Sequence, residues 1–140
     1  MQLISIEQLK ELNFTKYADF TFSEAGINFS FIGQESKELG HVYFWIEREG
    51  DLLRVAYVGK AGKTMKARCN QQLGGFSGAS KSKAGLRHAE NLKNGHKKGF
   101  AYHVFSRKSN VMEVFGEWIS IHSAEEEALI KKFSPPWNRI

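Results

Sequence analysis

Residues 41–60 read HVYFWIEREGDLLRVAYVGK and predict a β-hairpin. The segments 41–47 and 52–58 are apolar and β-prone, and the intervening residues 48–51, Arg-Glu-Gly-Asp, are typical of a tight turn. One tyrosine lies on each predicted strand, Tyr43 on the first and Tyr57 on the second, and Gly59 and Lys60 follow the second tyrosine. The hairpin therefore carries two phenols and a cation within a short distance along the chain.

The flanking sequence predicts one α+β domain. Capping-box patterns at residues 5–8 and 123–126 predict helix starts, and Pro135-Pro136 must end the second of these helices. Helices are also predicted at residues 63–72 and 84–94, with Gly95 as a C-cap, and a Gly/Ser-rich loop at 74–83. Residues 100–106 and 118–122 alternate like strands, whereas residues 14–36 fit either short strands or an ordered arm. This order of elements predicts a mixed or antiparallel sheet.

Composition limits the class of protein. A chain of 140 residues with 41% hydrophobic and 25% charged residues is expected to form a single folded domain. Cys69 is the only cysteine, which excludes an intrachain disulfide and a cysteine-cluster zinc site. The first ten residues lack the pattern of a signal peptide, and no apolar run approaches the ~20 residues of a membrane span. These observations predict a cytoplasmic protein.

Positive charge is concentrated in one part of the chain. Residues 57–110 carry 12 basic and one acidic side chain, a net charge of +11. By contrast, residues 1–56 have a net charge of −4 and residues 111–140 of −2. Clustered lysine and arginine are typical of phosphate-backbone binding, although a solvated surface is the alternative. The basic stretch begins at Tyr57, which favours nucleic-acid binding.

Several short motifs, in order, resemble the GIY-YIG nuclease family. They are Gly40-His-Val-Tyr43, Tyr57-Val-Gly59, Lys60, Arg68 and the ending from Glu126 to Pro135-Pro-Trp-Asn138. The resemblance implies a small three-stranded sheet flanked by helices, and hydrolysis of a nucleic-acid phosphodiester bond with one divalent cation, Mg²⁺ or Mn²⁺. On this basis residues 40–140 are predicted to form the nuclease domain, with a basic insertion at about 74–99. Residues 1–39 are predicted to form an N-terminal extension that packs on the core or serves as an oligomer arm.

The sequence departs from the family pattern at three places. His41 stands where the first motif has its glycine, and Arg68 comes one residue later than in common members. Gln72 stands where many members carry a histidine or tyrosine, four residues after the arginine. His88 is a possible replacement, although a DNA contact or a surface position is the simpler interpretation.

The acidic and basic candidates suit phosphodiester cleavage. Glu126 offers the hard oxygen ligand that magnesium prefers, with Glu125 and Glu127 as fallback ligands. The alternative for Glu126 is that it merely closes a capping box with Ser123. Arg68 is expected to bind the scissile phosphate, because its planar guanidinium pairs with two phosphate oxygens and stays charged.

The remaining candidates handle protons and position groups. Tyr43 is the first choice as general base and Tyr57 as the residue that positions water or phosphate, but the sequence does not rank the two phenols, and both also fit core strand positions. Lys60 is expected to lower the pKa of a neighbouring tyrosine or to touch phosphate, with plain solvent exposure as the alternative. Asn138 is expected to hold the C-terminal segment or a phosphate through its amide.

The predicted function is a magnesium-dependent endonuclease that cuts double-stranded DNA by direct attack of water. Residues predicted to contact the DNA are Lys63, Lys66, Gln72, Lys81, Lys83, Arg87, His88, Lys93, Lys97 and Lys98. The alternative is a nucleic-acid-binding module of the same fold without catalysis. Within the enzyme class, a site-specific restriction or homing cutter competes with a low-specificity phage or repair nuclease. A homo-oligomer, dimer or tetramer, is expected, with the aromatic residues of 14–31 as a candidate interface.

Overall fold

Strand β3 (His41–Glu49) lies inside a five-stranded antiparallel sheet whose strand order is β2-β1-β5-β3-β4. This computed structural model describes residues 1–33 and 35–139. Strand β3 pairs on one side with β4 (Leu52–Ala61) across the predicted hairpin and on the other with β5 (Ala101–Lys108). The predictions of an α+β fold and of the hairpin are confirmed, with the turn at residues 50–51 and not over the whole of 48–51.

The prediction of three strands is wrong, because β1 (Thr15–Ser23) and β2 (Gly26–Phe31) extend the same sheet. Strand β1 pairs with β5, and its aromatic side chains Tyr17, Phe20 and Phe22 all pack on the core beneath α2 and α3. Phe20 and Phe29 are buried and lie 4.8 Å apart between ring centroids. Apolar residues occupy every second position in both strands, as Ala18-Asp-Phe-Thr-Phe22 and Ile27-Asn-Phe-Ser-Phe31 show, so the strand pattern was present in the sequence.

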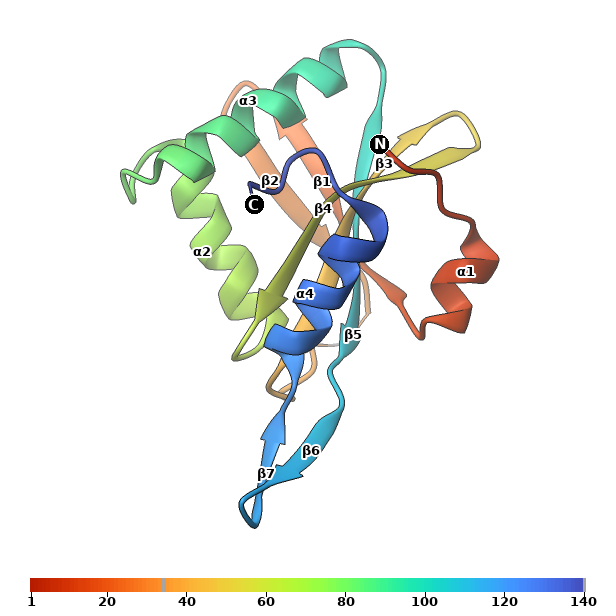
Figure 1. Cartoon of the computed structure of the whole chain (residues 1–140). Coiled ribbons are helices and arrows are strands. Elements are labelled where there is room, and N and C mark those ends of the chain that lie inside the picture. Colours follow the sequence, from red (N-terminus) through yellow and green to blue (C-terminus); the bar gives the residue numbers. More distant parts are fainter. Residues whose placement is uncertain (34, 140) are drawn as a thin grey trace.

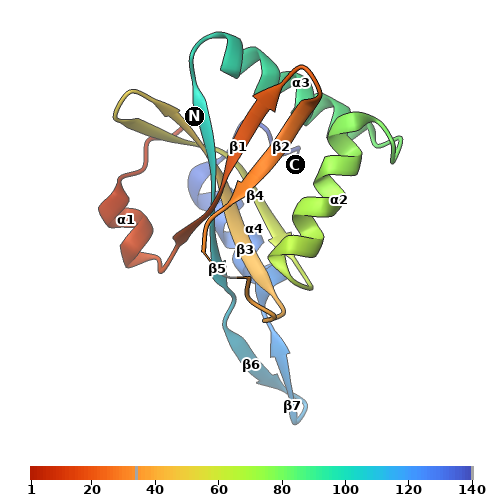
Figure 2. The same cartoon turned by 180° about the vertical axis from the view of Figure 1, so that it is seen from behind.

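Helices cover both faces of the sheet (Figures 1 and 2). One face packs against α2 (Met65–Ser77) and α3 (Lys83–Lys97), with Tyr43 and Trp45 of β3 in the core between them. The other face carries Phe44 and Ile46 and packs against α1 (Ile6–Glu11) and α4 (His122–Phe133). Residues of β3 are buried on both faces, as expected for an inner strand.

Gly75, in the predicted loop region, and Gly85, in the predicted helix that follows it, serve helix packing. Helix α2 continues through Gly75 to Ser77, so the prediction of a loop over 74–83 is wrong for its first four residues. A Cβ on Gly85 of α3 would lie 2.6 Å from the Gly75 backbone, which shows how closely the two helices cross. The prediction of Gly95 as a C-cap is wrong, because α3 runs past it to a C-cap at Lys98. Gly95 instead makes room for the Tyr102 phenol, which a Cβ there would overlap.

A second, two-stranded sheet projects away from the domain (Figures 1 and 2). It consists of β6 (Val111–Val114) and β7 (Glu117–Ser120), joined by a turn at residues 115–116. After α4, which ends before Pro135 as predicted, the chain runs beside β4, where the Trp137 amide donates to the Ala56 carbonyl at 3.1 Å. Within the described residues no helix is long and apolar enough to cross a membrane.

Candidate active site

Arg68 lies at the centre of the candidate site, on the first turn of α2. Its Nε donates to the Tyr43 hydroxyl at 3.1 Å and its Nη1 donates to Gln71 Oε1 at 2.7 Å. Two hollows meet at this side chain. One, of about 350 Å³, is also lined by Tyr57 and His88, and the other, of about 380 Å³, by Gly62 and neighbouring residues up to Gln71. The guanidinium is therefore the cation that both hollows share.

Tyr43 is enclosed by the protein. Its side chain is fully buried, and its hydroxyl accepts hydrogen bonds from Arg68 and, at 2.6 Å, from Nε2 of Gln72. Burial raises the pKa of the Tyr43 phenol far above its usual value, with Arg68 acting in the opposite direction. Gly59, directly opposite on β4, makes this placement possible, because a Cβ there would overlap the Tyr43 ring. Gly59 thus makes room for an aromatic ring of the protein itself.

Tyr57 has a more open setting on the neighbouring strand. It is half-buried, lines the 350 Å³ hollow, and packs between Trp45 and His88 at centroid distances of 4.5 and 4.8 Å. Burial raises the pKa of the Tyr57 phenol, the Arg68 charge opposes this, and the Glu126 carboxylate adds to it. The Tyr57 phenol therefore interacts electrostatically with both Arg68 and Glu126.

Glu126 reaches the site from the opposite side, on α4. Its Oε1 lies 3.8 Å from Nζ of Lys60, and the same ammonium donates to Ser123 Oγ at 3.1 Å. The predicted capping box is wrong: the N-cap of α4 is Ile121, two residues before Ser123, and it makes no side-chain cap hydrogen bond. Ser123 is thus inside the helix, where its hydroxyl accepts from Lys60. Glu126 does not close a capping box with Ser123, and its carboxylate lies next to the Lys60 ammonium.

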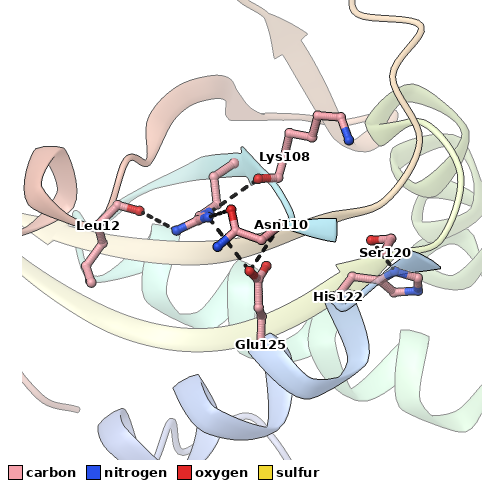
Figure 3. Close-up of polar contacts among 7 residues, drawn as sticks. Leu12, Lys108, Asn110, Ser120, His122 and Glu125 are labelled. Atoms are coloured by element: carbon pink, nitrogen blue, oxygen red, sulfur yellow. Dashed lines mark hydrogen bonds and ion pairs between the residues drawn. The ribbon is translucent and has the colours of Figure 1, made fainter. Parts of the chain in front are cut away.

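The two fallback carboxylates point elsewhere. Glu125 lies 3.7 Å from the Arg107 guanidinium and accepts from the Asn110 amide at 3.1 Å, on the side of α4 drawn in Figure 3. Glu127 pairs at 3.4 Å with Lys131 on the helix surface, where its side chain is 70% exposed. Of these three glutamates, Glu126 is the one that lies beside Lys60 and Tyr57.

Asn138 fastens the C-terminal segment to β4. Its Oδ1 accepts from the Val58 amide at 2.9 Å, and its Nδ2 donates to the Val58 carbonyl at 2.8 Å. Both polar groups of the amide are occupied by backbone next to Tyr57. This arrangement matches the holding role considered for Asn138 and places the residue beside the site.

The predicted DNA contacts fall into two groups. Gln72 and His88 are buried and line the 350 Å³ hollow. Burial lowers the pKa of His88 to about 4, and the positive charges of Arg87 and Arg68 lower it further. The others lie on the surface or partly exposed along α2 and α3: Lys63, Lys66, Lys81, Lys83, Arg87, Lys93, Lys97 and Lys98. Lys66 also lies over the Phe31 ring, 4.5 Å from its centroid. The far members, Lys93 and Lys97, border a hollow beside β1 and β2, away from Arg68.

Sequence reasoning missed Gln71, predicted a DNA contact for Gln72 and considered Ser123 only as a capping residue. Gln71 and Gln72 orient Arg68 and Tyr43, and Ser123 orients Lys60. The spacing of Gln72, four residues after Arg68, places both on one helix face and is the signal that was present. No local pattern identifies Ser123, because its partner is 63 residues away in the sequence.

The fold is similar to those of two solved structures. One is a mutant of bacteriophage T4 EndoII, with a TM-score of 0.68 and 21% identity over 95% of this chain and 97% of that chain. The other is the restriction endonuclease HPY188I in complex with product DNA, with a TM-score of 0.56 and 13% identity over 94% and 82% of the two chains. No protein-family model matches the sequence, and no curated protein matches it significantly. At these identities the comparisons show a shared, endonuclease-type fold.

Proposed function

We propose that this chain is a GIY-YIG-type, divalent-metal-dependent endonuclease that cleaves double-stranded DNA. The observation that carries the proposal is that Arg68 of α2 and Tyr57 of β4 line one hollow. Glu126 of α4 lies 3.8 Å from Lys60 of the same strand β4, and its charge acts on the Tyr57 phenol. The fold shared with a phage and a restriction endonuclease supports the same interpretation. The basic surface of α2 and α3 begins at this site, which fits a polyanionic substrate.

The donor groups fit a lightly held magnesium or manganese ion. Within residues 1–33 and 35–139, no three His, Cys, Asp or Glu side chains gather into a metal cage. Magnesium is nevertheless commonly held by one or two carboxylates together with waters and substrate phosphates, and Glu126 offers one such carboxylate. When bound there, the cation supplies charge that stabilises the phosphorane-like transition state and offsets the effect of Glu126 on the Tyr57 pKa.

Arg68 and Lys60 bind the phosphate in this proposal. Arg68 uses its guanidinium for the non-bridging oxygens of the scissile group, held in orientation by Tyr43 and Gln71. Lys60 has a side chain 45% exposed and lies next to Glu126, so its ammonium is available to an adjacent backbone phosphate. The two cations offset the negative charge that accumulates on phosphorus during attack.

Tyr57, rather than Tyr43, is the proposed general base. A fully buried phenol with two donors on its oxygen has no room for water or phosphate, whereas Tyr57 faces the 350 Å³ hollow. Tyr57 acts as its phenolate, formed when the phenol has released its proton to solvent. One O–H bond of water then breaks and the proton passes to the phenolate oxygen as the water oxygen bonds to phosphorus. The ester P–O bond then breaks, and the leaving oxygen is protonated from solvent. Tyr43 serves as a positioning residue for Arg68.

Plasmid nicking tests the proposal. Wild-type protein is expected to nick supercoiled DNA with magnesium and not with EDTA, and Glu126→Gln is expected to lose at least about 100-fold in rate while still binding duplex DNA. The matched control is Glu127→Gln, which neutralises the next glutamate on the exposed side of α4 and is expected to retain activity. Absence of nicking by wild type on varied DNA substrates, with binding retained, would instead assign the chain as a binding module.

A further inference from the structure

The 350 Å³ hollow extends well beyond the Arg68 guanidinium. Its wall includes both Arg68, near the start of α2, and Phe76, near the end of the same helix. These two residues are eight positions apart, which corresponds to about 12 Å along a helix axis. A phosphate bound to Arg68 therefore occupies only one end of the hollow and leaves the end beside Phe76 for another group.

The walls of this hollow are largely aromatic. Trp45, Tyr57, Phe76 and His88 all line it. The Trp45 ring packs against the other three, with centroid distances of 4.5 Å to Tyr57, 5.8 Å to Phe76 and 5.1 Å to His88. Such a surface gives a second phosphate no counter-charge, whereas a flat ring gains stacking and apolar contacts on it.

Two hydrogen-bonding atoms in the aromatic wall have no partner among the described residues. They are Trp45 Nε1 and His88 Nδ1, and their side chains are 1% and 8% exposed. Buried polar atoms are nearly always hydrogen-bonded, so two unpaired ones in the wall of a single hollow need an explanation. The indole nitrogen is a donor, and a neutral imidazole has one donor and one acceptor nitrogen. A ligand with polar groups at its edge can pair with them.

Size and chemistry together select the class of ligand. Pockets for small molecules measure about 300–1,000 Å³, so a hollow of 350 Å³ has room for one ring system and not for a base pair with its two strands. A nucleobase is flat, stacks on aromatic side chains and carries hydrogen-bonding groups at its edge. Its own nucleotide supplies the phosphate that suits the Arg68 end of the hollow.

We propose that the hollow holds one unstacked nucleobase of the DNA strand, from a nucleotide next to the phosphate that Arg68 binds. This inference rests on the proposed function for its substrate and for the role of Arg68. A base inside a duplex has both faces covered, so it must leave the stack to enter the hollow. Stacking on the aromatic wall offsets part of that cost, and DNA with a base that is already unpaired avoids most of it.

Binding of the Glu126→Gln chain to three DNA duplexes tests the proposal. One duplex is fully paired, the second carries one extra unpaired adenine or thymine, and the third carries an abasic sugar in place of that base. The duplex with the unpaired base is expected to bind roughly tenfold more tightly than the other two, because it alone offers a base that is free to stack. Equal affinity for the unpaired base and the abasic sugar would mean that the chain responds only to flexible DNA, and overturns the proposal.

Filling the hollow provides a matched pair of variants. Ala84 lines the hollow from the exposed first turn of α3, so Ala84→Trp places a large ring at its mouth. In the Glu126→Gln background this variant is expected to lose the preference for the unpaired base and to keep its affinity for fully paired DNA. Ala79→Trp is the control, because Ala79 is an exposed residue of the α2–α3 loop outside the lining of the hollow, and it is expected to keep the preference. With circular dichroism unchanged, a preference that survives Ala84→Trp contradicts the base site.

The Trp45 indole signal gives a readout at the hollow itself. The chain has three tryptophans, so its ¹H–¹⁵N spectrum contains three indole signals, and the variants Trp118→Phe and Trp137→Phe identify the one from Trp45. The duplex with the unpaired base is expected to shift this signal and the abasic duplex to leave it in place. A Trp45 signal that does not move with the unpaired base also overturns the proposal.

These measurements separate the base site from the proposed catalysis, because they use a chain that is expected not to cut. Nicking by a wild type that shows no preference for the unpaired base would leave the proposed function standing. A chain that prefers the unpaired base and never nicks DNA would leave the base site standing.

Discussion

Tyr43 and Tyr57 stand on adjacent strands, yet the structure gives them opposite surroundings. Tyr43 is sealed in the core, with its hydroxyl held by Arg68 and Gln72, whereas Tyr57 lines a hollow beside the same arginine. Their ring centroids are only 6.2 Å apart. Tyr43 therefore helps to orient Arg68, whereas Tyr57 is accessible to a substrate. The sequence alone does not distinguish these two roles.

The largest difference is expected between the two phenylalanine variants. Tyr57→Phe should lower the nicking rate by about 10²- to 10⁴-fold, the usual contribution of a general base, with little change in stability. Tyr43→Phe should instead lower the free energy of unfolding by about 1–3 kcal/mol, because two buried donors lose their acceptor. Single-turnover nicking assays and urea unfolding of both variants measure the two effects.

The pH dependence of the rate separates the roles further. A Tyr57 base predicts a rate that rises with pH in wild type and in Tyr43→Phe, and a flat profile in Tyr57→Phe. If Tyr43→Phe alone abolished both the rate and its pH dependence, Tyr43 would be the general base and Tyr57 the residue that orients Arg68.

A smaller effect is expected at His88, which packs against the open side of Tyr57. The pKa of His88 is about 4 in the folded chain and near 6.5 when unfolded, so between these values the unfolded chain binds one more proton. Stability contributed by the neutral ring is therefore complete above pH 6.5 and is lost as the pH falls toward 4, by about 3 kcal/mol in total. Urea unfolding at a series of pH values measures the loss.

The matched comparison for this loss uses a second histidine of α3. His88→Gln is expected to remove this part of the pH dependence, whereas His96→Gln, which replaces an exposed ring on the same helix, should retain it. If the His88 variant lost stability between pH 6.5 and 4 as steeply as wild type, the hollow beside Tyr57 would be wetter than its burial indicates.

Local patterns predicted the hairpin, most helices and the order of the candidate residues, because each depends on neighbours within a few positions. The strands β1 and β2 were left open, since β1 joins the sheet through β5, which lies far along the chain, and β2 joins it only through β1. The same limit applied to the site. Residue types suggested Arg68 and Glu126, but the ranking of the two tyrosines depends on burial, which arises from α2 and α3 packing over the sheet.

The smallest effect we predict concerns Gly59, beneath the Tyr43 ring. A methyl group there would overlap the phenol across the β3–β4 pair, so Gly59→Ala must push the ring away from Arg68 and Gln72. Overpacking of a well-filled core typically costs about 1–3 kcal/mol, and we expect the lower part of this range because the strand conformation itself suits alanine. Thermal or urea unfolding measures the cost.

Gly74→Ala is the matched control, because Gly74 is inside α2 and the nearest atom to a Cβ there is 3.9 Å away. Alanine at a helix interior should stabilise the chain by roughly 0.5–1 kcal/mol, opposite in sign to the effect at Gly59.

The double variant Gly59→Ala/Tyr43→Phe tests whether the role of Gly59 is to make room for the Tyr43 ring. If Gly59 serves the ring, the clash remains in the double variant, because the phenylalanine ring occupies the same space, and the two losses are non-additive. If the losses in free energy of unfolding were strictly additive, Gly59 would act independently of Tyr43. Arg68 would then be oriented by contacts other than the one with Tyr43.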